Sequence, residues 1–214
     1  MLYIVSTPIG SLEDITFRAI AMLKSCDYIL AEDTRRTITL LRHYAIEKKL
    51  VSYNDINDSR KTPSIIADLK EGKTVCLVSD SGTPCINDPG YVLVKECIAN
   101  SIKVSPVPGP SAFLSALVCS GLPTDRFTYY GFLPKGSGRR ERILLQIIDR
   151  NETSILYESP HRLIRTIEEI SQRCNRELVV ARELTKHFEE FIYGKPKDIL
   201  AKLEKRSIKG EFVI

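Results

Sequence analysis

Short apolar stretches alternate with helical patterns through the first half of the chain, and this order constrains the fold more than any other feature. The stretches at residues 2–6, 28–31, 50–53, 74–79 and 103–107 are rich in Val, Ile and Tyr, and their apolar residues are mostly continuous. Continuous apolar strands are typical of parallel sheets, which are buried on both faces. The order therefore predicts a mainly parallel sheet with helices on both sides.

Polar residues and prolines mark the expected starts of helices between these strands. Asp33 or Thr34 can cap a helix that runs to Tyr44, because a short polar side chain accepts a hydrogen bond from a first-turn amide. Thr62 followed by Pro63 is typical of an N-cap and the first residue of a helix.

A break at residues 120–125, which read SGLPTD, divides this pattern from a second mixture of strands and helices. The length of 214 residues suits one or two domains. We therefore expect an α/β fold with two α/β domains, residues 1–120 and 121–214. The first should hold the mainly parallel sheet and the second a mixed sheet.

Composition narrows the class of protein. Hydrophobic residues make up 43% and charged residues 27% of the chain, which is typical of globular proteins and excludes a disordered or fibrous chain. The six cysteines form no Cys-x-x-Cys pair and the three histidines have no ligand spacing, so we expect reduced thiols and no metal site. The longest apolar segment, residues 112–118, is too short to span a membrane, and a cytoplasmic location is expected.

The net charge of +4 is unevenly distributed. Residues 1–125 carry 13 Lys and Arg against 14 Asp and Glu, whereas residues 126–214 carry 18 against 13. A basic second half is compatible with a polyanionic partner, and an ordinary solvated basic surface is an equal alternative.

Distinctive loops follow four of the expected strands, at residues 6–10, 32–35, 80–84 and 108–112, and all but the second contain Gly and Pro. In a parallel sheet, ligands bind outside the carboxyl ends of the strands, where these loops meet. A single loop of this kind is usually a plain turn, but four at one sheet edge predict a pocket. The chain has neither a Gly-x-x-x-x-Gly-Lys-Ser/Thr loop nor a Gly-x-Gly-x-x-Gly loop after its first strand, which disfavours a nucleoside triphosphatase or a nicotinamide dehydrogenase.

Seven stretches in this order resemble the tetrapyrrole methylase superfamily: residues 6–10, 31–35, 79–90, 107–113, 121–134, 157–162 and 181–186. Within it they are similar to the branch that methylates small-subunit ribosomal RNA on the ribose 2′-hydroxyl of a decoding-site cytidine. The resemblance implies a homodimer that binds S-adenosylmethionine in the cleft between its domains and acts on ribosomal RNA within the 30S subunit, with no DNA or membrane partner. A relative that acts on a tetrapyrrole or a diphthamide precursor, and a non-catalytic RNA-binding assembly factor, are the alternatives.

The resemblance also implies where the cofactor binds. Its expected contacts are Pro8, Ile9, Asp80, Gly82, Thr83, Ile86, Ser111, Ala112, Tyr157, Ala181 and Gly210. A helix cap or a turn is the alternative role for Thr83 and Ser111.

Methylation of a ribose hydroxyl needs the hydroxyl to be positioned and to lose its proton. The candidate catalytic residues are Asp33, Arg35, Glu183 and Lys186. A helix cap for Asp33 and a surface ion pair for Arg35 are the structural alternatives.

A basic loop at residues 135–142 is expected to contact RNA phosphates through Lys135, Arg139, Arg140 and Arg142. A solvated loop is the alternative interpretation.

Overall fold

The computed structural model describes residues 1–204 and 206–214, which divide into two compact units, residues 1–111 and 112–214. The boundary lies nine residues before the one expected from sequence, because helix α5 (Ala112–Val118) packs against strands of the second unit, β7 (Thr153–Glu158) and β10 (Phe212–Val213).

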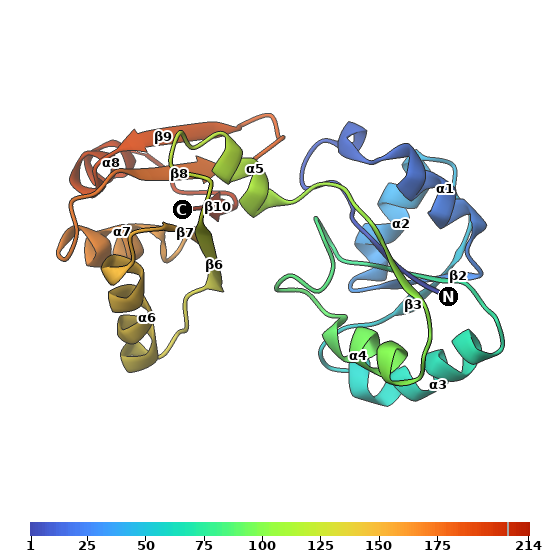
Figure 1. The fold of residues 1–214 in the computed structure, drawn as a ribbon. Coiled ribbons are helices and arrows are strands. Elements are labelled where there is room, and N and C mark those ends of the chain that lie inside the picture. The colour runs from blue at the N-terminus through green and yellow to red at the C-terminus, as the bar shows by residue number, and fades with distance from the viewer. Residues whose placement is uncertain (205) are drawn as a thin grey trace. The chain divides into compact units, whose positions relative to one another are not determined.

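The first unit is built on a five-stranded parallel sheet (Figure 1). Its strands are β1 (Leu2–Val5), β2 (Tyr28–Ala31), β3 (Lys49–Ser52), β4 (Val75–Val78) and β5 (Val104–Val107), in the order β3-β2-β4-β1-β5. Every neighbouring pair is parallel, so the carboxyl ends of all five strands lie at one edge. The prediction of a parallel sheet is confirmed.

Helices cover both faces of this sheet. A short 3₁₀ turn (Leu12–Asp14) precedes α1 (Phe17–Ser25), which with α2 (Thr34–His43) packs on one face, where Leu23 and Leu41 join a buried cluster with Ile29. The helices α3 (Asp58–Lys70) and α4 (Tyr91–Ala99) pack on the other, where Ile65 and Leu93 join Leu30 and Leu77.

The expected helix starts are partly correct. Asp33 is the N-cap of α2, and its carboxylate accepts a hydrogen bond from the amide of Arg35. The cap expected at Thr62 is wrong, because α3 begins at Asp58 and already contains Thr62 and Pro63. The Thr62 hydroxyl instead donates to the carbonyl of Asp58 (2.8 Å) and makes a buried hydrogen bond with the hydroxyl of Tyr53 (2.9 Å).

The second unit contains a mixed sheet with the strand order β6-β7-β10-β8-β9. The remaining strands are β6 (Phe127–Phe132), β8 (Leu178–Arg182) and β9 (Glu190–Gly194); β6 and β7 are parallel and the other pairs antiparallel, as predicted. Helices α6 (Ser137–Asp149), α7 (Leu163–Ser171) and α8 (Pro196–Leu203) contribute to its buried clusters. Over the described residues, no helix combines the length and the apolar character needed to cross a bilayer.

A β-bulge interrupts the pairing of β6 with β7. Tyr129 pairs with Ile155, but Gly131 pairs with Leu156, and Gly131 has a φ of 62°. Glycine tolerates this left-handed backbone without the steric cost that a Cβ would add. The extra residue shifts the alternation of side chains, so Phe132, which pairs with Tyr157, lies on the same face of the sheet as Tyr129.

Candidate functional site

Backbone and hydroxyl hydrogen bonds join three of the loops at the carboxyl edge of the first sheet. The loop after β1 pairs with the loop after β4 through Thr7 and Gly82, whose amides and carbonyls bond in both directions at 2.9 and 3.0 Å. The Thr83 hydroxyl lies 3.0 Å from the hydroxyl of Ser6 and bonds to the carbonyl of Pro110 at 3.1 Å. The structure therefore brings together the loops that the sequence predicted to meet.

Two glycines in these loops allow close approach of the backbone. A Cβ placed on Gly109 would lie 3.0 Å from the Cβ of Ser6. Gly82 has a φ of 78°, and a Cβ there would lie 3.4 Å from a methyl group of the buried Ile9. A side chain at Gly109 would crowd Ser6, whereas a side chain at Gly82 would strain the left-handed backbone.

The remaining expected cofactor residues of the first unit lie in the same loops. Pro8 is partly buried beside Ile9, and Asp80 is partly buried after β4. Ile86 is exposed farther along that loop, and Ser111 ends the loop after β5, directly before Ala112. These positions leave polar backbone and small side chains at one edge of the sheet.

Carboxyl groups gather on the β2 and β4 side of this edge. Asp80 accepts a hydrogen bond from the amide of Asp33 (3.0 Å), and the amide of Asp80 donates to Glu32 (3.3 Å). Burial raises the pKa of Glu32. Burial, reinforced by the charges of Glu32 and Asp80, raises the pKa of Asp88 to about 7, although a hydrogen bond with Ser79 opposes the shift.

Asp33 and Arg35 form an ion pair at the start of α2. The Arg35 guanidinium donates to both oxygens of Asp33, with Nη2 2.6 Å from Oδ2, and Arg35 is largely exposed. The hydrogen bonds from the Arg35 side chain and amide lower the pKa of Asp33 to about 2. Both structural alternatives, the helix cap and the ion pair, are therefore present, and Asp33 is a weak proton acceptor at neutral pH.

In the second unit, Tyr157 and Ala181 face the same residue from two strands. Both pair with Val213 of the central strand β10, so the three side chains share one face of the sheet. Tyr157 also accepts a hydrogen bond from the amide of Phe113 (3.2 Å).

Glu183, Lys186 and Gly210 lie together in this unit. The Lys186 ammonium lies 3.0 Å from Glu183 and 2.9 Å from Glu211, and a Cβ on Gly210 would lie only 2.6 Å from Cγ of Glu183. Burial alone would lower the pKa of Lys186, but the two carboxylates outweigh it and raise this pKa. Lys186 therefore stays protonated at neutral pH and is a cation rather than a base. The backbone of Glu183 has a φ of 49°, in the left-handed region.

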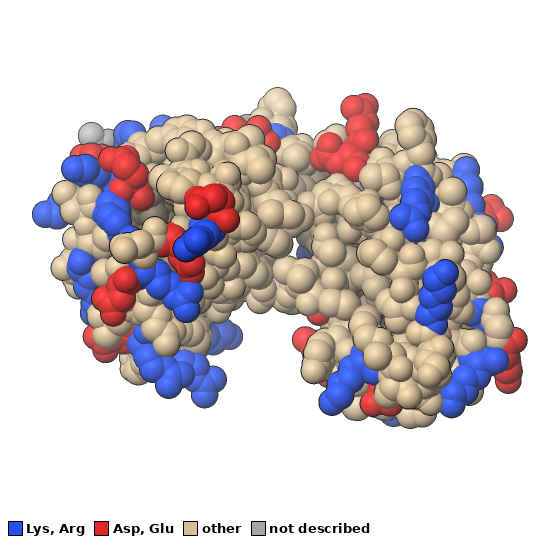
Figure 2. Space-filling model, viewed as in Figure 1, with Lys and Arg blue, Asp and Glu red and all other residues tan. Residues whose placement is uncertain are grey.

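The cations of the basic loop differ in their exposure to solvent. Lys135, Arg139 and Arg142 are exposed, and Figure 2 shows Lys and Arg side chains gathered over the region where Figure 1 draws α6. Arg140 is buried, so the expectation that it contacts RNA phosphate is wrong. A residue whose side chain is 4% exposed has no surface to offer a phosphate.

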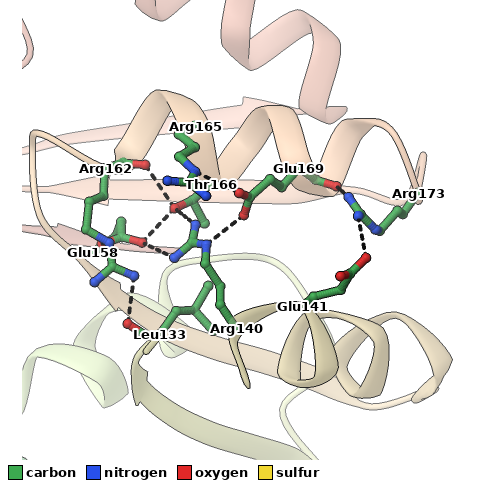
Figure 3. Close-up of polar contacts among 9 residues, drawn as sticks. All are labelled: Leu133, Arg140, Glu141, Glu158, Arg162, Arg165, Thr166, Glu169 and Arg173. Carbon is green, nitrogen blue, oxygen red and sulfur yellow. Dashed lines mark hydrogen bonds and ion pairs between the residues drawn. The ribbon is translucent and has the colours of Figure 1, made fainter. Parts of the chain in front are cut away.

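Arg140 belongs to a buried polar network that joins α6, β7 and α7 (Figure 3). Its guanidinium contacts Glu169 (2.7 Å), Thr166 (2.6 Å) and, at 3.7 Å, Glu158. Glu158 is fully buried and also contacts the Thr166 hydroxyl (2.6 Å) and Arg162 (3.3 Å). The network fixes the first turn of α6 to the end of β7.

A cavity of about 400 Å³ lies elsewhere in the second unit. Apolar residues of α5, β7 and β8 dominate its lining, together with Ile214. Of the site residues expected from sequence, Ala181 alone belongs to the lining described. Because the candidate catalytic groups lie outside it, we do not assign this cavity to the reaction.

Comparison with known proteins identifies the family. The family model of the tetrapyrrole (corrin/porphyrin) methylases matches residues 1–200. The chain belongs to this family. The resemblance seen in its loop motifs is confirmed.

Individual methyltransferases are similar to this chain over its whole length. Ribosomal RNA small subunit methyltransferase I of Thermotoga maritima is 47% identical over 214 residues, covering all of this chain and 96% of that protein. The protein of the same name from Escherichia coli O157:H7 is 48% identical over 218 residues, covering all of this chain and 76% of that protein.

Solved methylase structures share the fold at low identity. Diphthine synthase has a TM-score of 0.77 and 13% identity, with 100% of this chain and 88% of that chain covered. Uroporphyrin-III-C-methyltransferase from Thermus thermophilus has a TM-score of 0.67 and 19% identity, with 99% and 92% covered. These comparisons confirm the predicted fold class.

Sequence reasoning gave no role to three residues that the structure makes prominent: Asp88, Phe132 and Glu158. Both carboxylates lie in stretches that resemble the family: Asp88 in the loop after β4, and Glu158 at the end of β7. Their positions in these stretches are the signal that the sequence offers for them. No signal in the sequence shows the burial that distinguishes them from surface carboxylates.

Proposed function

We propose that this methylase family member transfers a methyl group from S-adenosylmethionine to the ribose 2′-hydroxyl of a cytidine in small-subunit ribosomal RNA. The observation that carries the proposal is identity of 47–48% over the whole chain to curated small-subunit ribosomal RNA methyltransferases. Likeness to the diphthine and uroporphyrin enzymes is limited to 13–19% identity, so a tetrapyrrole or diphthine-type substrate has weaker support.

The first unit's loops have the chemistry that the donor needs. S-adenosylmethionine, when bound, supplies an electrophilic methyl on a sulfonium cation. Backbone groups around Gly82, Thr83 and Gly109 would bind its polar ends, and the close approach of Gly109 to Ser6 supports tight packing of these loops. The nearby carboxyls of Glu32 and Asp80 would attract the positive charge.

The second unit's contacts with the cofactor follow from the family resemblance. We propose Tyr157, Ala181 and Gly210 as contacts of the bound molecule, and likewise Ser111 and Ala112. Tyr157 and Ala181 are held by their shared pairing with Val213, which supports a fixed surface.

The ribose hydroxyl must give up its proton as the new bond forms. Asp33, paired with Arg35, has a pKa too low for efficient proton acceptance, whereas Asp88, with a pKa of about 7, matches a general base at neutral pH. We therefore assign proton acceptance to Asp88. Arg35 and Lys186 would act as cations that hold phosphate or stabilise the developing negative charge.

The exposed cations Lys135, Arg139 and Arg142 supply the proposed contact with the RNA backbone. None of the three forms an ion pair with another residue in the described part of the chain, so their charge is available to phosphate. A basic second half of the chain agrees with this role.

The test uses purified protein, labelled S-adenosylmethionine and 30S subunits that lack the modification. We expect label in the ribosomal RNA, located by mass spectrometry on a 2′-O-methylcytidine.

Asp88→Asn should lower kcat strongly while the affinity for the cofactor stays the same. Neutralising Lys135, Arg139 and Arg142 together should weaken RNA binding and reduce the slope of log affinity against log salt by about 0.7 to 0.9 for each lost phosphate contact. Cofactor binding without any transfer to 30S subunits or their RNA would contradict the proposal.

A further inference from the structure

Phe132 is an exposed aromatic residue in an unusual setting. It is 50% exposed at the last position of β6, three residues before Lys135. The bulge at Gly131 places its ring on the face that carries Tyr129 and Tyr157, whereas regular alternation would place it on the opposite face. Bulges that redirect a side chain occur next to functional sites in many proteins.

The ring is the outer end of a row of aromatic side chains. The centroids of Phe132 and Tyr157 are 5.6 Å apart with their planes at 60°, and those of Tyr157 and Tyr129 are 5.2 Å apart at 74°. Tyr129 in turn stacks on Phe113 at 4.6 Å. Edge-to-face and stacked pairs of this kind stabilise one another, so the row holds the Phe132 ring in place.

Hydrogen bonds anchor the chain both before and near the end of the basic loop that follows Phe132. Leu133 is buried, and its carbonyl accepts a hydrogen bond of 2.6 Å from Arg162, which also contacts Glu158 (Figure 3). The other end of the loop is held through Arg140. The segment that carries Phe132 and the exposed cations is therefore joined at both ends to the same network of buried polar contacts.

From this arrangement we propose that Phe132 stacks on the base of the nucleotide to be methylated, next to the phosphates held by the basic loop. Single-stranded nucleotides in folded RNA can present unstacked bases, and aromatic rings bind the faces of such bases. A half-exposed ring in contact with the expected cofactor residue Tyr157 offers such a face. The inference rests on the proposed function and adds a residue that selects and orients the substrate.

The experiment compares three replacements at one position with a matched control. Phe132→Leu keeps an apolar side chain but removes the aromatic face, while Phe132→Tyr and Phe132→Trp keep it. Phe127→Leu is the control, because Phe127 is an exposed phenylalanine (39%) on the same strand and the same sheet face. The measurements are kcat and KM for 30S subunits, the dissociation constant of S-adenosylmethionine by calorimetry, and thermal unfolding.

Phe132→Leu should lower kcat/KM for 30S subunits about 5- to 100-fold, the range expected for losing one base stack, and leave cofactor affinity and the unfolding temperature unchanged. The Tyr and Trp variants should stay within about threefold of the parent, as should Phe127→Leu. Parental kcat/KM in Phe132→Leu would overturn the proposal. So would weaker cofactor binding with an unchanged KM for 30S subunits, since the ring would then serve the adenine of the cofactor.

Failure of the proposed function gives a different result. If the parent protein transfers no methyl group to 30S subunits, the proposed function fails, and Phe132 is then judged by the affinity of the parent and Phe132→Leu for 30S subunits. Equal affinity would overturn the stacking proposal, whereas a loss confined to Phe132→Leu, with Phe127→Leu unaffected, would support it.

Discussion

Arg140→Met should destabilise the protein strongly, although Arg140 belongs to the stretch that the sequence predicts to be a basic surface loop. Methionine keeps an unbranched apolar stem of similar length, so the change removes the guanidinium without opening a large cavity. It removes the charged contacts at 2.7 Å to Glu169 and 2.6 Å to Thr166 and the 3.7 Å approach to Glu158.

The expected loss follows from the contacts. A hydrogen bond to a charged group contributes about 1.5 to 3 kcal/mol, so the two short contacts give about 3 to 6 kcal/mol. Two features favour the lower end: Glu169 is partly exposed, and the Nη1 atom of Arg140 is buried without a hydrogen-bond partner. Glu158 keeps Arg162 and Thr166 as partners, which limits the penalty of its buried charge. We expect a loss of about 3 kcal/mol.

The matched control is Arg142→Met, on the same helix with the same chemical change. Arg142 is exposed, so its replacement should alter the free energy of unfolding by no more than about 0.5 kcal/mol. Both variants are unfolded with urea at pH 7 and followed by circular dichroism and by tyrosine fluorescence, and their midpoints and slopes are compared with the parent. A loss below about 1 kcal/mol for Arg140→Met, or equal losses in both variants, would refute the assignment of Arg140 to the interior.

Three further outcomes are expected. Gly109→Val should abolish binding of S-adenosylmethionine in calorimetry while unfolding stays cooperative, because the new side chain must displace Ser6; parental affinity would remove this loop from the site. Asp88 has a pKa of about 7 in the folded state against 3.8 for an unperturbed aspartate, so the folded state holds a proton that the unfolded chain releases, and stability should fall as pH rises from about 4 to 7. Asp88→Asn should remove about 1 to 3 kcal/mol of this pH dependence, after allowance for partial exposure, and equal slopes of stability against pH for parent and variant would contradict the assignment. Sedimentation at micromolar concentration should show a homodimer, and a stable monomer would reject that expectation.

The parts of the fold that could be predicted are those that depend on local pattern. Continuous apolar strands, helices between them and turn residues after them indicate a parallel sheet, because each signal lies within a few residues of the element it specifies. The meeting of the loops after β1, β4 and β5 follows from parallel topology alone, and Asp33 was identified as a cap because its partner amide is two residues away. Pro63 is a misleading signal, because it lies inside a helix that begins more than one turn earlier, at Asp58.

The sequence by itself determined the two α/β domains, the edge of the first sheet at which the loops meet and, through the order of its motifs, the family. Only the tertiary structure decided the roles of individual residues. Arg139 and Arg140 are neighbours of the same type, yet one faces solvent and the other enters a buried network supplied by Glu158, Thr166 and Glu169 from other elements. Phe132 reaches the face of Tyr157 through a bulge, whose position depends on pairing with a distant strand. Burial and strand register are set by residues far away in the chain, and a local pattern does not record them.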